Sequence, residues 1–446
     1  MSRDYDPTLE PDVEFYQATN QDLTGKPGNL IKSEQLAQDA AAALDDASAT
    51  YRVLYQSASG LGDEETKPTN EPIAVSGLIA FPPGEAPAGG WPVVSWAHGT
   101  VGSADKSAPS MDPYLEDVPL ANAGLGLLRK INKAPHALLN AFLRAGWAVA
   151  MTDYEGLGTY GNHPFLLGVS EGRGILDIVP AVHQLAAQTV GQQISDRYAI
   201  VGHSQGGQAA LWGAHLASTG AYPTTSTSTL IGVAALAPAS NLKDGLFVAY
   251  QSWEPFGDLG AFYPLFCNGV FGGDPTIKME LIFQPDAVTQ YLTDFNTKAR
   301  VELSEEDFWM TRPPLAAPDP PESTNRSAGI FRTQLGSWPQ TAAWNKYWTQ
   351  VAGFNPAKKI TVPIRISQAA GDTRVNPANT TTLLEQLRDI GGIGPITEKF
   401  YGGDESLPDP VLGLDPETLG EHFGLLVYEL EIQAVLDWFA GLRARR

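Results

Sequence analysis

The feature that most constrains this chain is a short stretch in which a predicted strand, a tight turn and a predicted helix follow one another. Residues 198–201 (YAIV) have the apolar, β-branched content of a buried strand, and they lead into Gly202-His203-Ser204-Gln205-Gly206. Small residues follow, among them Gly207 and Ala209, which allow a helix to pack closely against a sheet. This order is typical of a nucleophile elbow, in which a strained turn exposes the serine above a sheet.

The same five-residue pattern occurs a second time, at residues 168–172 (GVSEG). No β-branched run precedes that match, and Glu171 would place a negative charge where an oxyanion develops. We therefore predict that Ser204, and not Ser170, is the nucleophile. The alternative is that Ser204 occupies a glycine-rich turn in an inactive relative.

Length and composition restrict the class of protein further. The chain has 446 residues, 43% of them hydrophobic and 18% charged, which suits a globular protein with a sizeable core. Its length suits one α/β core with a large insertion. The formal net charge of −21 repels nucleic acid and anionic membranes, so nucleic-acid partners are excluded. No apolar run approaches the length of about 18 residues that indicates a transmembrane segment.

The single cysteine, Cys267, allows neither an intrachain disulfide nor a thiolate metal cluster. No His-Glu-x-x-His helix and no acidic loop with calcium spacing occurs, so we expect neither a metal nor a cofactor. The first residues lack the apolar core of a signal peptide. As written, the chain is expected to be cytoplasmic; the alternative is a secreted protein whose leader is absent from this numbering.

The pattern of strands and helices predicts an α/β-hydrolase fold, with a mostly parallel central sheet and helices on both faces. Residues 1–50 are expected to form an arm on the core, including an amphipathic helix over Ile31–Leu44. Residues 51–55 and 73–81 suggest an antiparallel start to the sheet. Residues 51–240 would form the first part of the core and residues 358–446 the second.

Between these two parts, strand patterns disappear and aromatic residues become frequent. We predict that residues 241–357 form a large cap, inserted after the strand that follows the elbow. Most of its aromatic side chains must build the core of the cap itself, and a few should face a substrate.

Partners for Ser204 occur downstream in the order Ser, acid, His that this fold requires. Asp372 ends a predicted core strand at residues 360–372, which distinguishes it from the rival acids Asp404, Glu405 and Asp409. Apart from His215, within the elbow's own helix, His422 is the only histidine after Ser204. It is expected in a loop directly before a helix over Phe423–Arg446.

An oxyanion hole in this fold combines two backbone N–H groups, one after the nucleophile and one from the loop after an earlier strand. Gln205 and Thr100 occupy these positions in the sequence. His98 precedes the nucleophile, so we expect it to brace the loop rather than to act as the base. The residues expected to contact substrate are His98, Gly99, Tyr154, Phe256 and Phe262.

Taken together, five motifs in this order resemble the secretory lipase family, the lipase A type of α/β-hydrolase, over about residues 15–440. They are residues 98–100 (HGT), 153–158 (DYEGLG), 202–207 (GHSQGG), 371–372 (GD) and 421–423 (EHF). The resemblance implies a triad of Ser204, Asp372 and His422 and a cap that shapes acyl-chain preference. It further implies hydrolysis of triacylglycerols or shorter carboxylic esters.

The leading hypothesis is therefore a serine carboxylic-ester hydrolase, a carboxylesterase or triacylglycerol lipase whose substrate is a small-molecule ester or a lipid ester. Two alternatives remain: an acyltransferase with the same triad, and a non-catalytic ligand-binding protein on a hydrolase scaffold. Acyl length, oligomeric state and cap mobility are left open by the sequence.

Overall fold

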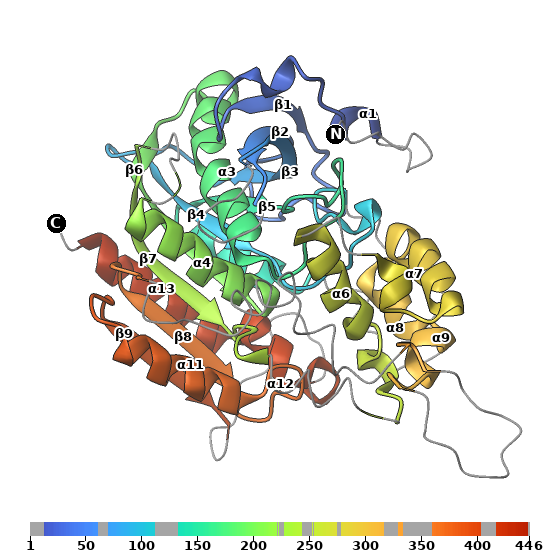
Figure 1. The fold of residues 1–446 in the computed structure, drawn as a ribbon. Helices are drawn as coiled ribbons and strands as arrows, with labels where there is room; N and C mark the ends of the chain where they lie inside the picture. The colour runs from blue at the N-terminus through green and yellow to red at the C-terminus, as the bar shows by residue number, and fades with distance from the viewer. Residues whose placement is uncertain are drawn as a thin grey trace, which may run out of the picture.

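The structure is a computed structural model. It describes residues 13–60, 70–111, 133–220, 222, 227–242, 252, 254–273, 278–315, 329–332, 359–402 and 416–444. Within these residues a nine-stranded sheet runs in the order β1-β2-β3-β5-β4-β6-β7-β8-β9 (Figure 1). The strands are β1 (Leu30–Gln35), β2 (Ala49–Ala58), β3 (Pro72–Phe81), β4 (Trp91–Ala97), β5 (Ala148–Thr152), β6 (Ile194–His203), β7 (Thr229–Leu236), β8 (Ile364–Ala369) and β9 (Ile396–Tyr401).

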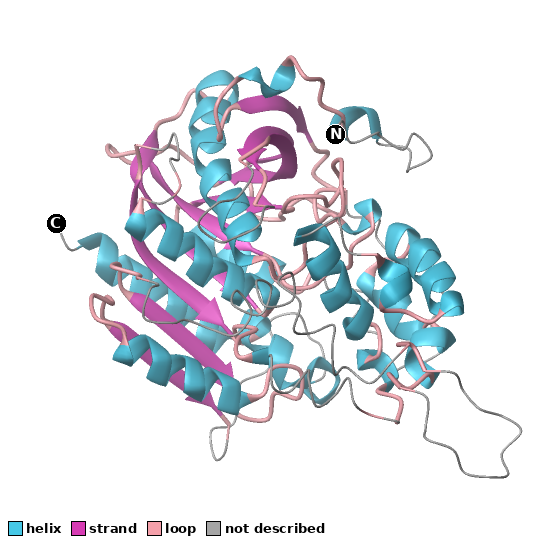
Figure 2. Ribbon diagram, in the orientation of Figure 1, coloured by secondary structure: helices cyan, strands magenta, loops and turns pink. Residues whose placement is uncertain are grey.

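The sheet is antiparallel at one edge and parallel elsewhere. Strands β1, β2, β3 and β5 pair antiparallel, whereas β5, β4, β6, β7, β8 and β9 pair parallel. Parallel strands need crossover connections, which here are mostly helices, and Figure 2 shows the resulting mixture of strands and covering helices. The expected fold class, including the antiparallel start, is confirmed.

Helices cover both faces of the sheet. The main ones beside it are α2 (His136–Arg144), α3 (Gly168–Thr189), α4 (Gln205–Thr219), α11 (Pro377–Asp389), α12 (Pro416–Val427) and α13 (Glu429–Ala444), and a short α1 (Val13–Tyr16) lies near the start of the chain. Alternating side chains of β4 face opposite sides, as a strand requires. Val93 and Ala97 pack with α3 and α4, while Val94 and Trp96 pack with α2 and α13.

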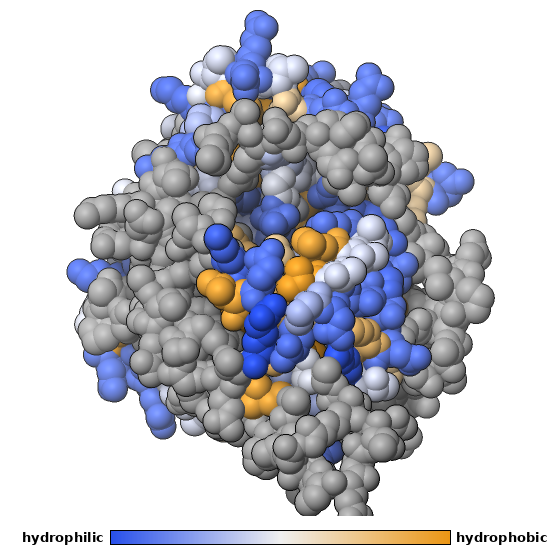
Figure 3. Space-filling model, turned by 45° about the vertical axis from the view of Figure 1, so that its right-hand side comes forward, coloured by the Kyte–Doolittle hydropathy of each residue, from blue (hydrophilic) through white to orange (hydrophobic). Residues whose placement is uncertain are grey.

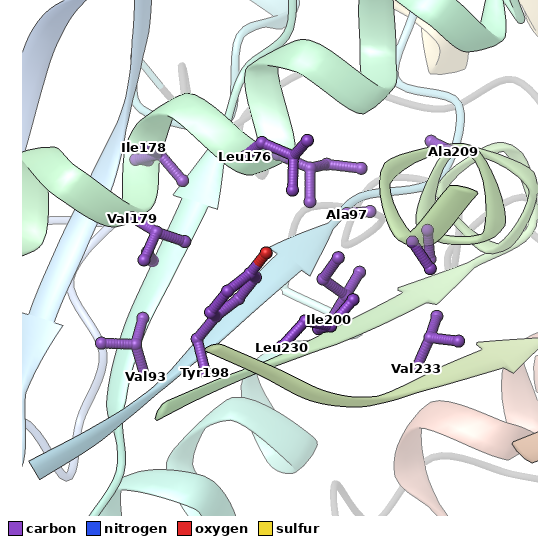
Figure 4. Packing of buried hydrophobic residues seen from close by; sticks show 14 of the residues in the cluster. Val93, Ala97, Leu176, Ile178, Val179, Tyr198, Ile200, Ala209, Leu230 and Val233 are labelled. Carbon is purple, nitrogen blue, oxygen red and sulfur yellow. The ribbon is translucent and has the colours of Figure 1, made fainter. Parts of the chain in front are cut away.

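Figure 4 shows the first of these two cores. Leu176, Ile178 and Val179 on α3 point toward Tyr198 and its neighbours on the sheet. Each of these side chains is at least 97% buried. Burial of a large apolar side chain contributes roughly 1.5–3 kcal/mol, so the strand that leads to Ser204 is firmly anchored in this core.

Two sequence-based predictions about local structure are wrong. Residues 31–44 do not form a helix: Leu30–Gln35 is the edge strand β1, paired antiparallel with β2. Backbone pairing with an existing strand outweighs a weak local helical pattern. In addition, the final helix is not one element starting at Phe423, because α12 already contains His422 and α13 follows it after a single residue.

Between β7 and β8 lie η6 (Gly257–Leu259), α6 (Phe262–Gly273), η7 (Met279–Leu281), α7 (Pro285–Thr297), α8 (Arg300–Glu305) and α9 (Asp307–Thr311). These helices group beside the sheet rather than on its faces (Figure 1). Aromatic residues of this segment, including Phe271, Phe283, Tyr291 and Trp309, form a third hydrophobic cluster, which also holds Cys267. On the face in Figure 3, hydrophobic side chains lie together near the middle, among hydrophilic ones. Parts of residues 241–357 lie outside the described residues.

Candidate active site

The elbow at Ser204 is a strained turn that only glycines on either side permit. Ser204 has φ 58° and ψ −121°, and it precedes the first residue of α4. A Cβ atom on Gly202 would lie 2.0 Å from the Gly206 carbonyl oxygen, and one on Gly206 would lie 1.9 Å from the Ala97 carbonyl oxygen. Backbone strain of this kind is concentrated at functional sites. The strand, turn and helix occur as the sequence pattern predicts.

A buried acid and a histidine are paired near this turn. Nδ1 of His422 lies 2.6 Å from Oδ2 of Asp372, and both side chains are at least 95% buried. The other oxygen of Asp372 accepts the backbone N–H groups of Arg374 and Val375, each at 2.9 Å. Burial alone would raise the pKa of Asp372, but these hydrogen bonds and the His422 ring outweigh it, so the pKa lies below its usual value. Asp372 is therefore a carboxylate that is held in place by the backbone and can accept a hydrogen bond from the His422 ring.

Ser204 and His422 line one cavity, of about 520 Å³, which falls within the usual size range of small-molecule sites. Its walls are mainly apolar. The sheet side supplies Trp96, Met151, Phe165, Leu166, Phe423 and Leu426, and the inserted helices and their approaches supply Phe256, Leu259, Phe262, Tyr263, Phe266 and Arg300. The predicted contact residues His98 and Gly99 also line it, as do Thr100 and Gln205, the two residues predicted to form an oxyanion hole.

Tyr154 is the predicted substrate-contact residue that the structure does not bring to the cavity. Its side chain is fully buried, its hydroxyl donates to the His98 carbonyl oxygen at 3.0 Å, and its ring lies 4.3 Å from the His98 ring. It is absent from the residues lining the cavity. Tyr154 has φ +74° and packs against the loop that follows β4, so it supports His98 rather than the cavity wall.

His98 lies against the same loop. Its Nδ1 is 2.7 Å from the Gly99 carbonyl oxygen and its Nε2 is 3.3 Å from the Asp153 carbonyl oxygen. Burial lowers its pKa to about 4, so the ring is neutral at physiological pH. Its position agrees with the expected bracing role.

The second Gly-x-Ser-x-Gly match, at residues 168–172, forms the start of a buried helix rather than a turn after a strand. Ser170 is buried within α3, and its Oγ donates to Oε2 of Glu155 at 2.6 Å. The glycines of this match allow close helix packing, since a Cβ atom on Gly168 would lie 2.2 Å from the Trp212 indole nitrogen. The Ser170 hydroxyl group is thus hydrogen-bonded within the core, and Ser170 does not line the cavity.

Three residues near the site were not found by sequence reasoning. Nε2 of His203 donates to the His422 carbonyl oxygen at 2.8 Å, which ties the elbow to α12. Nε2 of Gln368 donates to Oδ2 of Asp372 at 3.0 Å. Glu171 contacts the Gln205 side chain at 2.7 Å. The His203 and Glu171 contacts join residues 219 and 34 positions apart, whereas Gln368 lies only four positions before Asp372. The only signal in the sequence was the place of His203 within the elbow motif.

Four acids have raised pKa values in the folded chain, and these values predict how the free energy of unfolding changes with pH. Burial raises the pKa of Glu171 to about 8, of Asp177 and Asp105 to about 7, and of Asp153 to about 6. The same acids in an unfolded chain lose their protons near pH 4. Above about pH 6.5 the folded chain therefore holds more protons, and the free energy of unfolding falls as the pH rises to about 8. Below that pH four buried histidines oppose the effect, because burial lowers their pKa to about 3 or 4 and they take up protons only in the unfolded chain: His98, His136, His163 and His203.

Thermal unfolding followed by circular dichroism at pH 6.5, 7, 7.5 and 8 should show a melting temperature that decreases through this series. Asp177→Asn should flatten the decrease, because it removes one of the titrating groups. Asp372 does not oppose the trend, since its lowered pKa acts only in more acidic solution. A melting temperature that rises from pH 6.5 to pH 8 would contradict the prediction.

The chain is similar to known lipases and esterases. The family model for Secretory lipase matches residues 130–297. No protein with a curated description matches. Among solved structures, the rice cell wall degrading esterase LipA from Xanthomonas oryzae superposes with a TM-score of 0.63 at 16% identity, covering 94% of this chain and 99% of that one. Candida antarctica lipase A in its closed state superposes with a TM-score of 0.61 at 17% identity, covering 89% and 83%.

These similarities, together with the sheet and its elbow, define the fold as that of an α/β-hydrolase. The resemblance to the secretory lipases that the five motifs indicated is confirmed by the family match over residues 130–297.

The description of that family fits the secreted alternative for the location of this chain. In the part of the chain that the structure describes, no helix is both long enough and apolar enough to cross a membrane.

Proposed function

We propose that this protein is a serine carboxylic-ester hydrolase, an esterase or lipase that acts through Ser204, His422 and Asp372. The observation that carries the proposal is the 2.6 Å contact between His422 Nδ1 and Asp372 Oδ2, made at the wall of the cavity that Ser204 also lines. The strained backbone of Ser204 supports it, because such strain fixes a nucleophile in an exposed position. The lipase and esterase similarities support the same class of reaction.

The proposed chemistry begins with His422 as a base. A carboxylate can only accept hydrogen bonds, so the Nδ1 proton of His422 faces Asp372 and Nε2 is left without a proton. Nε2 takes the hydroxyl proton of Ser204 as the oxygen attacks the ester carbonyl, and it then returns the proton to the leaving alcohol. Asp372 keeps this tautomer and stabilises the charged ring. Water cleaves the acyl-enzyme by the same route.

The proposed oxyanion hole consists of the backbone N–H groups of Gln205 and Thr100. Gln205 is the first residue of α4, so its N–H belongs to the positive end of a helix. Thr100 follows β4 and lines the cavity with Gly99. A Cβ atom on Gly99 would lie 3.5 Å from Cβ of Ser204, which shows how closely this loop approaches the nucleophile. Donors fixed in this way stabilise charge in the transition state without reorganisation.

The mainly apolar walls favour small to medium acyl esters or acylglycerols. Phe256 and Phe262 are proposed to contact the acyl or alcohol part of the substrate, since both line the cavity. We propose further that residues 241–357 act as the cap over a core of residues 51–240 and 358–446, with residues 1–50 as an arm that adds edge strand β1 to the sheet. The helices grouped beside the sheet support this division (Figure 1).

A fluorophosphonate probe tests the proposal directly, because it reacts covalently only with an activated serine. We expect the protein to gain one adduct and tandem mass spectrometry to locate it on Ser204. Ser170 in the same sample is the internal control and should stay unmodified, because its hydroxyl is buried and bonded to Glu155. A protein that binds ester analogues but takes up no probe would instead be a non-catalytic scaffold.

A further inference from the structure

Glu171 is a buried carboxyl group that the proposed mechanism leaves unused. It lies in the first turn of α3 and is fully buried. Its Oε1 accepts two hydrogen bonds, from the Leu166 N–H at 2.9 Å and from Nε2 of Gln205 at 2.7 Å. Both donors belong to residues that line the cavity with Ser204. The carboxyl group thus joins two parts of the cavity wall.

His163 completes the contacts of the Gln205 side chain. Nδ1 of His163 lies 3.0 Å from the Glu155 carbonyl oxygen, which can only accept, so Nδ1 carries the proton. The unprotonated Nε2 then accepts from Nε2 of Gln205 at 2.9 Å. Burial lowers the pKa of His163 to about 3, so this tautomer of the neutral ring persists at physiological pH.

The side-chain amide of Gln205 therefore donates one hydrogen bond to Glu171 and the other to His163. An amide nitrogen has only two protons, and both are used in buried bonds. Its orientation is consequently fixed from two sides. This matters because the main-chain N–H of the same residue is the proposed oxyanion donor, one peptide bond from Ser204.

Leu166 shows that the other bond to Glu171 also holds a conformation in place. Its φ is +59°, a value that a leucine rarely adopts and that needs outside support. The Leu166 N–H that donates to Glu171 supplies such support. In the same segment, the His163 carbonyl oxygen accepts from Nδ2 of Asn268 on α6 at 2.7 Å, which connects it to the inserted helices.

On the basis of the proposed function, we propose that Glu171 and His163 are positioning residues, which hold Gln205 so that its N–H stays aligned for the oxyanion and hold Leu166 in the cavity wall. Neither residue touches the reacting atoms. Their effect is on the alignment of the oxyanion hole and therefore on kcat rather than on substrate binding.

The charge of Glu171 provides a separate signature. Burial raises its pKa to about 8, so at neutral pH it is mostly an uncharged acid. The titratable groups around it are His163 at 3.9 Å, Tyr154, and Glu155, which is bonded to the neighbouring Ser170. None of these three supplies a positive charge. Deprotonation above about pH 8 places a negative charge against the side chain of Gln205, whose N–H is the proposed oxyanion donor. A charge of the same sign as the oxyanion raises the energy of the transition state.

The test compares Glu171→Gln, which keeps the accepting oxygen but cannot ionise, with Glu171→Met, which removes it. Hydrolysis of p-nitrophenyl butyrate is measured from pH 6 to pH 10. We expect Glu171→Met to lower kcat by about 10- to 100-fold with little change in KM, as misalignment of an oxyanion donor does. Glu171→Gln should keep kcat within about twofold at pH 7, and it should lack the decline of kcat that the wild type shows above pH 8.

Asp177→Asn is the matched control, because Asp177 is a buried acid on the same helix that instead bonds Ser57 and Tyr222. It should leave kcat and the alkaline decline as in the wild type. A Glu171→Met protein with wild-type kcat overturns the inference. If that variant does not fold, the pH profiles decide: an identical alkaline decline in the wild type and Glu171→Gln overturns it. Activity surviving in Ser204→Ala would instead refute the proposed function.

Discussion

Ser204→Ala is expected to lower the turnover of a chromogenic ester by at least about 10⁴-fold while leaving the fold intact. The reason is that alanine removes the attacking oxygen, and no other described hydroxyl group occupies the elbow. The side chain is small, and the substitution does not touch the backbone bonds of the turn, from the Ser204 N–H to the Leu236 carbonyl oxygen and from the Ala239 N–H to the Ser204 carbonyl oxygen. Circular dichroism and thermal unfolding should therefore match the wild type.

Ser170→Ala is the matched control, since the same five-residue pattern surrounds that serine. It removes the hydrogen bond to Glu155 and should cost about 1 kcal/mol of stability. Its ester turnover should stay close to that of the wild type. Loss of activity in Ser170→Ala together with retained activity in Ser204→Ala would reverse the assignment of the nucleophile.

Asp372→Asn is expected to lower kcat by about 10⁴-fold with little change in the fold. The backbone N–H groups of Arg374 and Val375 donate to one side of residue 372, and they will keep the amide oxygen of asparagine there. The amide NH₂ group then faces Nδ1 of His422. A donor at this place forces the imidazole to carry its proton on Nε2, so that it cannot accept the proton of Ser204.

Steady-state kinetics measure this effect, and the nitrogen chemical shifts of the His422 ring report the tautomer. Asp389→Asn is a suitable control, because Asp389 is an exposed acid at the end of α11 and should tolerate the change. An Asp372→Asn enzyme with kcat near the wild type would show that another acid orients His422.

Much of the fold follows from local patterns in the sequence. The strand before Ser204, the strand that ends near Asp372 and the antiparallel β2–β3 pair all have the alternation or β-branched content that predicts them. Such patterns reflect burial, which β2 and β4 share along most of their length. Edge strand β1 lacks this signal, because its six residues are only half-buried or exposed. Its extended structure depends on hydrogen bonding to β2, and this pairing cannot be predicted from the local sequence pattern of β1.

The site divides in the same way. Ser204, Asp372 and His422 could be proposed from motif order, and the structure places Asp372 and His422 in contact. The residues around this group could not be predicted from the sequence. The hydrogen bonds of Gln205 to His163 and Glu171, for example, join residues 42 and 34 positions apart. Tyr154 was expected to contact substrate, whereas its ring packs at a tilt against the His98 ring and does not line the cavity. This contact joins residues 56 positions apart, so no local pattern could indicate it.

The backbone bonds of the elbow have a consequence for how such a protein can change over evolution. Ser204 is bonded through its main chain to Leu236 and Ala239, which lie where the chain leaves β7 for the inserted helices. Both bonding partners, Leu236 and Ala239, come before the inserted helices in the chain. Sequence in the inserted segment after residue 242 can therefore diverge, and with it the shape of the cavity wall formed by Phe256 and Phe262, without loosening the serine. Under the proposed function, new substrate preferences can evolve while the catalytic chemistry is inherited unchanged.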